Sequence, residues 1–92
     1  MHASLDLTSP VFLLDGGDMG ARIRAYDWAS SPLGVPEAWP QSLCTLVGVM
    51  LGSSQPMFIA WGPELTLLYN DSYAEILGLK HPQALGQPFL DV

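Results

Sequence analysis

Few side chains in this sequence could carry out catalysis or hold a metal ion. The one thiol is Cys44, and the two imidazoles are His2 and His81. Cys44 has no neighbouring histidine or cation that would lower its pKa, and neither histidine has a cysteine or carboxylate at ligand spacing. We therefore expect no enzyme activity, no catalytic residue, no metal site and no cofactor.

Two carboxylates, Asp15 and Asp18, flank the pair Gly16-Gly17. A loop that binds a divalent cation would need oxygen ligands alternating over a longer stretch, and that pattern is absent. A phosphate loop would need its glycines between a strand and a helix. A solvated turn is therefore the favoured interpretation of this segment.

The side-chain amide of Asn70 directly follows an apolar run and precedes a helix-start signal. An amide in this position can cap the next helix and tie the strand end to it, or it can contact a ligand. The four residues from Ser72 to Glu75 also match a capping box, in which a serine hydroxyl and a glutamate carboxylate bond to backbone N–H groups at the helix start. The predicted structural caps are thus Asn70, Ser72 and Glu75.

The composition limits the class of protein. Ninety-two residues fit one small domain, and 49% apolar against 13% charged residues is unlike a disordered chain. A net charge of −6 argues against binding to nucleic acid or to an anionic membrane. The single cysteine suits a reducing compartment, no signal-peptide pattern is present, and the apolar run 43–51 is too short to span a bilayer. A soluble cytoplasmic protein is expected.

The first half of the sequence predicts two helices. A loosely attached leader over 1–17 precedes a short helix over 18–28, with Asp18 as its N-cap. Residues 29–39 contain two prolines and a glycine, so they form a connector anchored by two tryptophans. Pro40 suits the first position of a second helix. Its apolar stripe packs inside the fold, with its remaining edge available as a dimer interface, and consists of Leu43, Leu46, Val47, Met50 and Leu51.

The second half predicts a β-hairpin over 56–71. Pro56 opens the first strand, Gly62-Pro63-Glu64 forms the turn, and Leu65 begins the second strand. Both faces are largely apolar and are expected to be covered by helices, whereas both edges expose unpaired backbone groups. A short helix ending at Gly78 and one further helical turn over 81–85 complete the prediction.

In this order, the strings PMFIAW, LTLLYND, YAEILG and HPQALGQPFLDV resemble the opening of a PAS domain. The upstream string DWASSPLGVPEAWPQSL resembles the N-terminal cap that precedes such a domain in bacterial sensor histidine kinases. The resemblance covers residues 18–92 and implies an α+β fold with a helical cap over 18–55 and the first half of a PAS domain over 56–92. The long connecting helix and the last three strands of that fold are missing.

The resemblance implies a PAS-type sensory or interaction module of two-component signal transduction. Trp61, Tyr69 and Tyr73 would line the ligand cavity or its mouth, although an aromatic cluster of this kind is more often core. The flavin-binding cysteine and the haem-binding histidine of relatives lie beyond Val92, so no cofactor site carries over. We expect a homodimer, or a contact with another PAS or kinase protein. The alternative is a non-sensing adaptor that completes its sheet on a partner protein.

Overall fold

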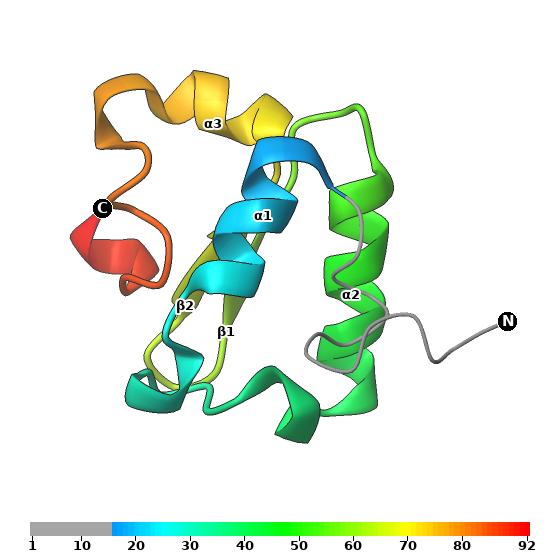
Figure 1. The fold of residues 1–92 in the computed structure, drawn as a ribbon. Helices are drawn as coiled ribbons and strands as arrows, with labels where there is room; N and C mark the ends of the chain where they lie inside the picture. Colours follow the sequence, from blue (N-terminus) through cyan, green and yellow to red (C-terminus); the bar gives the residue numbers. More distant parts are fainter. Residues whose placement is uncertain (1–15) are drawn as a thin grey trace, which may run out of the picture.

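The computed structural model describes residues 16–92, and most of the predicted leader lies outside them. The described residues form the expected α+β fold, with three α-helices and one antiparallel hairpin, and α3 lies at one end of the hairpin (Figure 1). The elements are α1 (Gly17–Ala25), α2 (Gln41–Gly52), β1 (Phe58–Trp61), β2 (Thr66–Tyr69) and α3 (Asp71–Leu77), with short 3-10 turns η3 (Trp28–Ser30), η4 (Pro36–Ala38), η5 (Gly78–Lys80) and η6 (Phe89–Asp91).

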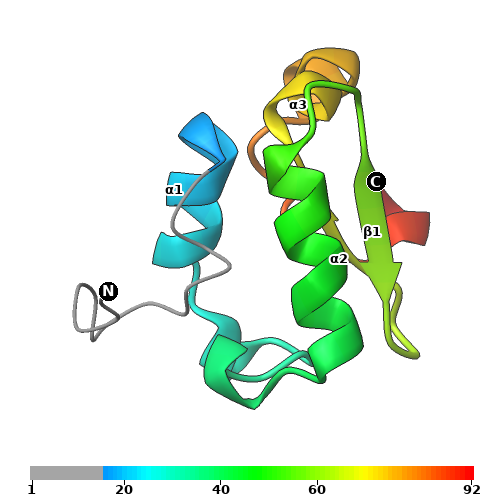
Figure 2. The same ribbon diagram turned by 90° about the vertical axis from the view of Figure 1, so that its right-hand side faces the viewer.

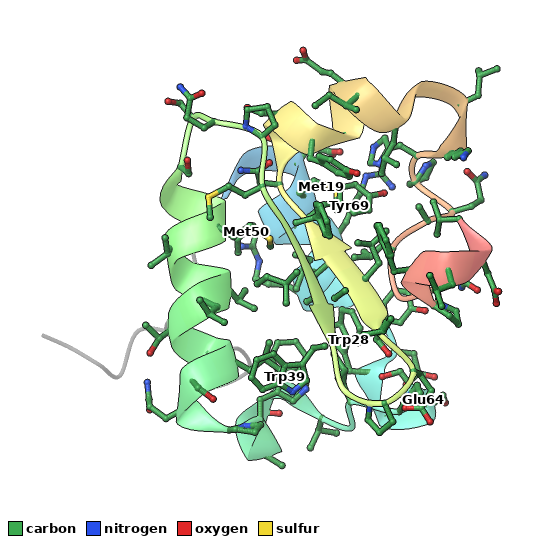
Figure 3. The ribbon with its side chains drawn as sticks, turned by 180° about the vertical axis from the view of Figure 1, so that it is seen from behind. Met19, Trp28, Trp39, Met50, Glu64 and Tyr69 are labelled. Carbon is green, nitrogen blue, oxygen red and sulfur yellow. The ribbon has the colours of Figure 1, made fainter. Side chains whose placement is uncertain are left out.

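The hairpin is shorter than predicted. β1 begins at Phe58 rather than Pro56, and β2 begins at Thr66 because Leu65 belongs to the turn, with a left-handed backbone at φ 53°. Phe58 pairs with Tyr69, and Trp61 pairs with Thr66. Figure 3 shows Glu64 at the tip of this turn and Tyr69 toward the opposite end of the hairpin.

Helix α2 supplies much of the core, as its stripe predicts. Pro40 is the residue before the helix rather than its first residue, and Gly52 ends it. Leu43, Val47, Met50 and Leu51 are buried within the chain, as expected for a stripe that packs inside the fold. Leu46 is the exception at 44% exposed, and Val49 on the same helix is 56% exposed. The dimer interface on α2 stays a prediction, and this exposed edge is where it would lie.

Helix α1 differs from the prediction at both ends. It runs over Gly17–Ala25, its N-cap is Gly16 rather than Asp18, and it ends before Trp28. The predicted anchoring of the connector by Trp28 and Trp39 is confirmed. Both indoles are buried and in edge-to-face contact at 5.3 Å, and their N–H groups donate to the carbonyls of Ile23 and Gly34, each at 2.8 Å. Figure 2 shows α1 and α2 together on one side of the hairpin.

The two edges of the hairpin are not alike, which corrects the expectation that both are open. The last segment of the chain runs beside β2 (Figure 1). The backbone N–H of Leu67 donates to Gln87 at 2.9 Å, and Gly86 and Phe89 donate to the carbonyls of Leu67 at 2.9 Å and Leu65 at 2.8 Å. The chain therefore closes the outer edge of β2 itself, and all four residues of β2 are buried.

Within the described residues, no helix combines the length and the apolar character that crossing a bilayer requires.

Candidate functional site

Asn70 joins four elements at the end of β2. Its side-chain oxygen accepts the backbone N–H groups of Tyr73 and Met57, both at 3.1 Å, and its amide nitrogen donates to the carbonyls of Met50 at 3.0 Å and Gln55 at 2.8 Å. The residue is only 2% exposed. The prediction that Asn70 caps the next helix and ties the strand end to it is confirmed. Because these bonds use both ends of the amide, we assign Asn70 a structural role.

The predicted capping box at Ser72 and Glu75 is wrong, because α3 begins two residues earlier with Asn70 as its N-cap. The Ser72 hydroxyl instead donates to the carbonyl of Ser54 at 2.9 Å, and Glu75 is exposed. The box pattern matched at the wrong register because Asn70 offers the better-placed side-chain acceptor.

Asp71 reaches across the fold to the start of α1. Its two carboxylate oxygens accept the backbone N–H of Met19 at 2.7 Å and of Asp18 at 3.2 Å. These are two of the N–H groups that a helix leaves unpaired at its N-terminus. A carboxylate from α3 therefore caps the N-terminus of α1 in place of a local N-cap side chain. The sequence did not predict this contact.

A chain of polar contacts links the core to α1. The Tyr69 hydroxyl and Nδ1 of His81 lie 2.8 Å apart, and Nε2 of His81 lies 3.9 Å from Asp18, which pairs with Arg22 at 2.7 Å. Burial raises the pKa of the Tyr69 hydroxyl, against the smaller lowering effects of the Arg22 charge and of the backbone at Leu85. His81 is half-buried and its ring contacts Tyr69 edge-on at 5.6 Å.

The aromatic residues predicted to line a cavity do not share one face. Tyr69 contacts Tyr73 at 6.0 Å and, by the register, shares a face with Phe58, which in turn contacts Tyr73 at 5.1 Å. Trp61 pairs with Thr66, so its side chain lies on the opposite face of the hairpin. Phe89 stacks on Phe58 at 5.1 Å. Tyr69 and Tyr73 thus belong to a packed aromatic group, and the role of the three residues in lining a ligand cavity stays a prediction.

Three surface hollows lie around Tyr26 and the segment 80–92. Their volumes are about 580, 370 and 300 Å³. The largest is lined mainly by Tyr26 and by residues of 80–92, with Lys80 and Asp91 as its charged side chains. None of the three is lined by Trp61, Tyr69 or Tyr73.

Cys44 is half-buried on α2, its sulfur contacts the Trp39 carbonyl at 3.7 Å, and burial raises the pKa of the thiol. Within residues 16–92, no group of three or more His, Cys, Asp or Glu side chains is arranged to hold a metal ion. His2 and Asp15 lie outside the described residues, and Asp18 pairs with Arg22.

The outer edge of β1 is the most distinctive candidate for a functional surface. In an antiparallel pair, a residue's N–H and C=O both point toward the partner strand or both point away. Leu67 directs both groups away from β1, to Gly86 and Gln87, and Ala60 lies directly opposite Leu67. The backbone groups of Ala60, and by the same alternation those of Phe58, therefore point to the outer edge of β1.

Within residues 16–92, no segment other than β2 hydrogen-bonds to β1 between Phe58 and Trp61. No charged side chain occurs from Met57 to Trp61, and Phe58 is 43% exposed. Natural proteins usually protect such an edge with a charge, a bulge or a covering segment. An uncharged, apolar and unpaired edge has the properties of a strand-docking surface.

No protein-family model matches this sequence, and neither the curated proteins nor the solved structures compared with it show significant similarity. The site is therefore interpreted from its own geometry.

Proposed function

We propose that this chain is a PAS-type interaction module of cytoplasmic signal transduction that acts by dimerisation, with a strand from a second copy completing its sheet at the outer edge of β1. The observation that carries the proposal is a contrast within the described part of the chain, between the paired outer edge of β2 and the unpaired, uncharged outer edge of β1. An isolated two-stranded hairpin is marginal in water, so an added strand would contribute stability as well as specificity.

The order of the elements supports the PAS assignment. Two cap helices, an antiparallel hairpin and a short helix capped by Asn70 follow one another as in the cap and first half of that fold. The sensory part of the proposal, binding of a small molecule, needs a cavity of the kind that the later strands of a PAS domain help to enclose.

Substitution of Ala60 by proline tests the docking edge. The Ala60 N–H points away from β2, so its removal leaves the hairpin ladder intact, and edge strands tolerate proline at such positions. We expect the wild-type chain to sediment as a dimer over a concentration series and Ala60→Pro to sediment as a folded monomer. Leu46→Lys is the control, because it places a charge on the exposed edge of α2 and should leave a dimer that forms through β1 unchanged.

A dimer lost in Leu46→Lys and retained in Ala60→Pro would assign the interface to α2 instead. A wild-type chain that is monomeric at every concentration would refute the homodimer. Far-ultraviolet circular dichroism of each variant establishes that the monomers remain folded, and native mass spectrometry of the same samples shows whether a small molecule stays bound.

The same β1 edge also favours a second candidate function, that of an adaptor which accepts a strand from a different protein. Its occupant would be an extended, apolar segment without acidic residues, because the chain carries a net charge of −6. A monomeric wild-type chain that retains no small molecule, and that binds such a peptide through β1 but not after Ala60→Pro, would favour the adaptor over the dimeric sensor.

A further inference from the structure

Helix α1 has little local support of its own. It is nine residues long and contains Gly17 and Gly20, and its N-cap Gly16 provides no side chain. Its i,i+4 pair, Asp18 with Arg22, is largely exposed and contributes little. Isolated helices of this length are marginal in water, and glycine inside a helix is unfavourable relative to alanine. The helical state of α1 must therefore come from what the helix contacts.

Those contacts lie at its two ends and along one face. The Asp71 carboxylate accepts two backbone N–H groups in the first turn, at 2.7 and 3.2 Å, and the Trp28 indole donates to the carbonyl of Ile23 in the last turn at 2.8 Å. Met19 and Ile23 are fully buried. The backbone at Gly17 has φ 64°, and a Cβ there would collide with the Asp71 carboxylate. The approach of α3 to α1 thus depends on a glycine at this position.

We propose that α1 is a latch helix, which is helical only while docked on Asp71 and which detaches as a unit while α2 and the hairpin stay folded. Asp71 is the latch. Detachment removes Met19 and Ile23 from the core and takes Asp18 away from His81, whose ring bonds to the Tyr69 hydroxyl.

Asn70, the residue before Asp71, connects the contact between Asp71 and α1 to the sheet. Asn70 holds the start of β1, the end of α2 and the start of α3 in one place, and Asp71 follows it directly. A displacement of the hairpin end therefore moves the carboxylate on which α1 depends. This inference concerns the described residues alone and stands whether or not the chain is a PAS-type module.

Hydrogen exchange measured by mass spectrometry tests the proposal with one variant on each side of the contact, Asp71 on α3 and Gly17 on α1. Asp71→Ala removes the carboxylate, and Gly17→Ala blocks its approach while leaving α3 intact. In both variants we expect the amides of α1 to exchange about tenfold faster or more, with those of α2 and β2 close to wild type, because local opening is independent of global unfolding.

Each variant has a matched control. Glu75→Ala removes an exposed carboxylate from the same helix as Asp71. Gly34→Ala adds a methyl group at a φ of 69°, similar to that of Gly17, where no atom lies within 4 Å. Both controls should leave α1 protected. The proposal is overturned if α1 keeps wild-type protection in Asp71→Ala and Gly17→Ala, and equally if α1, α2 and β2 lose protection together.

Discussion

The two strands of the hairpin have similar apolar sequences and different surroundings. β2, with the sequence TLLY, is buried along its whole length, whereas every residue of β1, with the sequence FIAW, keeps some exposure. The segment from Gly86 to Phe89 hydrogen-bonds along the outer edge of β2, whereas no segment of residues 16–92 pairs with the outer edge of β1. One hairpin thus provides an inner strand for the core and an outer strand available for contact with another chain.

The largest effect is expected at Asn70, where the two strands are tied together. Asn70→Ala removes the cap of α3 and leaves the buried carbonyl of Met50 and the partly buried backbone groups of Met57 and Gln55 without this partner. We expect a cost of about 4 kcal/mol in the free energy of unfolding. Ser72→Ala, at the residue that the sequence pattern favoured, should cost about 0.5 kcal/mol. Urea denaturation of both variants checks this, and equal losses would contradict the assignment of the cap.

The strands themselves should respond unequally to truncation. Leu67→Ala in β2 creates a cavity at a fully buried position and should cost about 3 kcal/mol, whereas Ile59→Ala at a half-buried position in β1 should cost about 1 kcal/mol. The measurement is the midpoint of urea denaturation at constant slope. A cost at Ile59 that matches the cost at Leu67 would mean that β1 is covered in solution, as in a tight dimer. In that case the denaturation midpoint would depend on protein concentration.

Opening the edge of β2 should make the two strands more alike. Gly86 has φ 80°, and a Cβ there would collide with the Tyr26 hydroxyl, so Gly86→Ala should cost about 2 kcal/mol and loosen the closing segment. The matched control is Gly34→Ala, which has a similar φ of 69° with no atom within 4 Å of the added Cβ and should cost about 1 kcal/mol. We expect the Leu67 amide, which donates to Gln87, to exchange faster in Gly86→Ala and not in Gly34→Ala.

The smallest effect concerns the Tyr69 hydroxyl at the buried end of β2. Its pKa is raised mainly by burial, so the folded state keeps this proton at a pH where the unfolded chain loses it. The free energy of unfolding should therefore fall as the pH rises above about 10, where an unfolded tyrosine ionises. In Tyr69→Phe this alkaline loss should be smaller, as measured by urea denaturation across that pH range, and an unchanged profile would exclude Tyr69 as its source.

The sequence predicted most of the elements because their signals are local. The stripe on α2, the glycine that ends α3 and the capping role of Asn70 follow from spacing and from the hydrogen-bonding capacity of single side chains. The strand limits were less accurate, since Leu65 was placed in a strand and adopts a turn conformation. The capping box failed because its pattern occurs at more than one register, and only the actual backbone path selects Asn70.

The contacts that the sequence missed all join residues far apart in the chain. Nothing local to Asp71 indicates that its carboxylate caps α1, and nothing local to His81 indicates that its ring bonds to Tyr69. The PAS resemblance and the dimer remain predictions, for which the β1 edge supplies a place to test.

By itself, the sequence determined the α+β class, the helical and extended segments, and the apolar side chains that must be buried, because these follow from local propensity and periodicity. Only the tertiary structure decided that, among the described residues, β2 is paired on both edges and β1 on one. It also decided that α1 depends on a carboxylate from α3. The pairing of a strand edge and the capping of a helix by a distant side chain depend on which segments the fold brings together. Such long-range contacts leave no local pattern in the residues that they join.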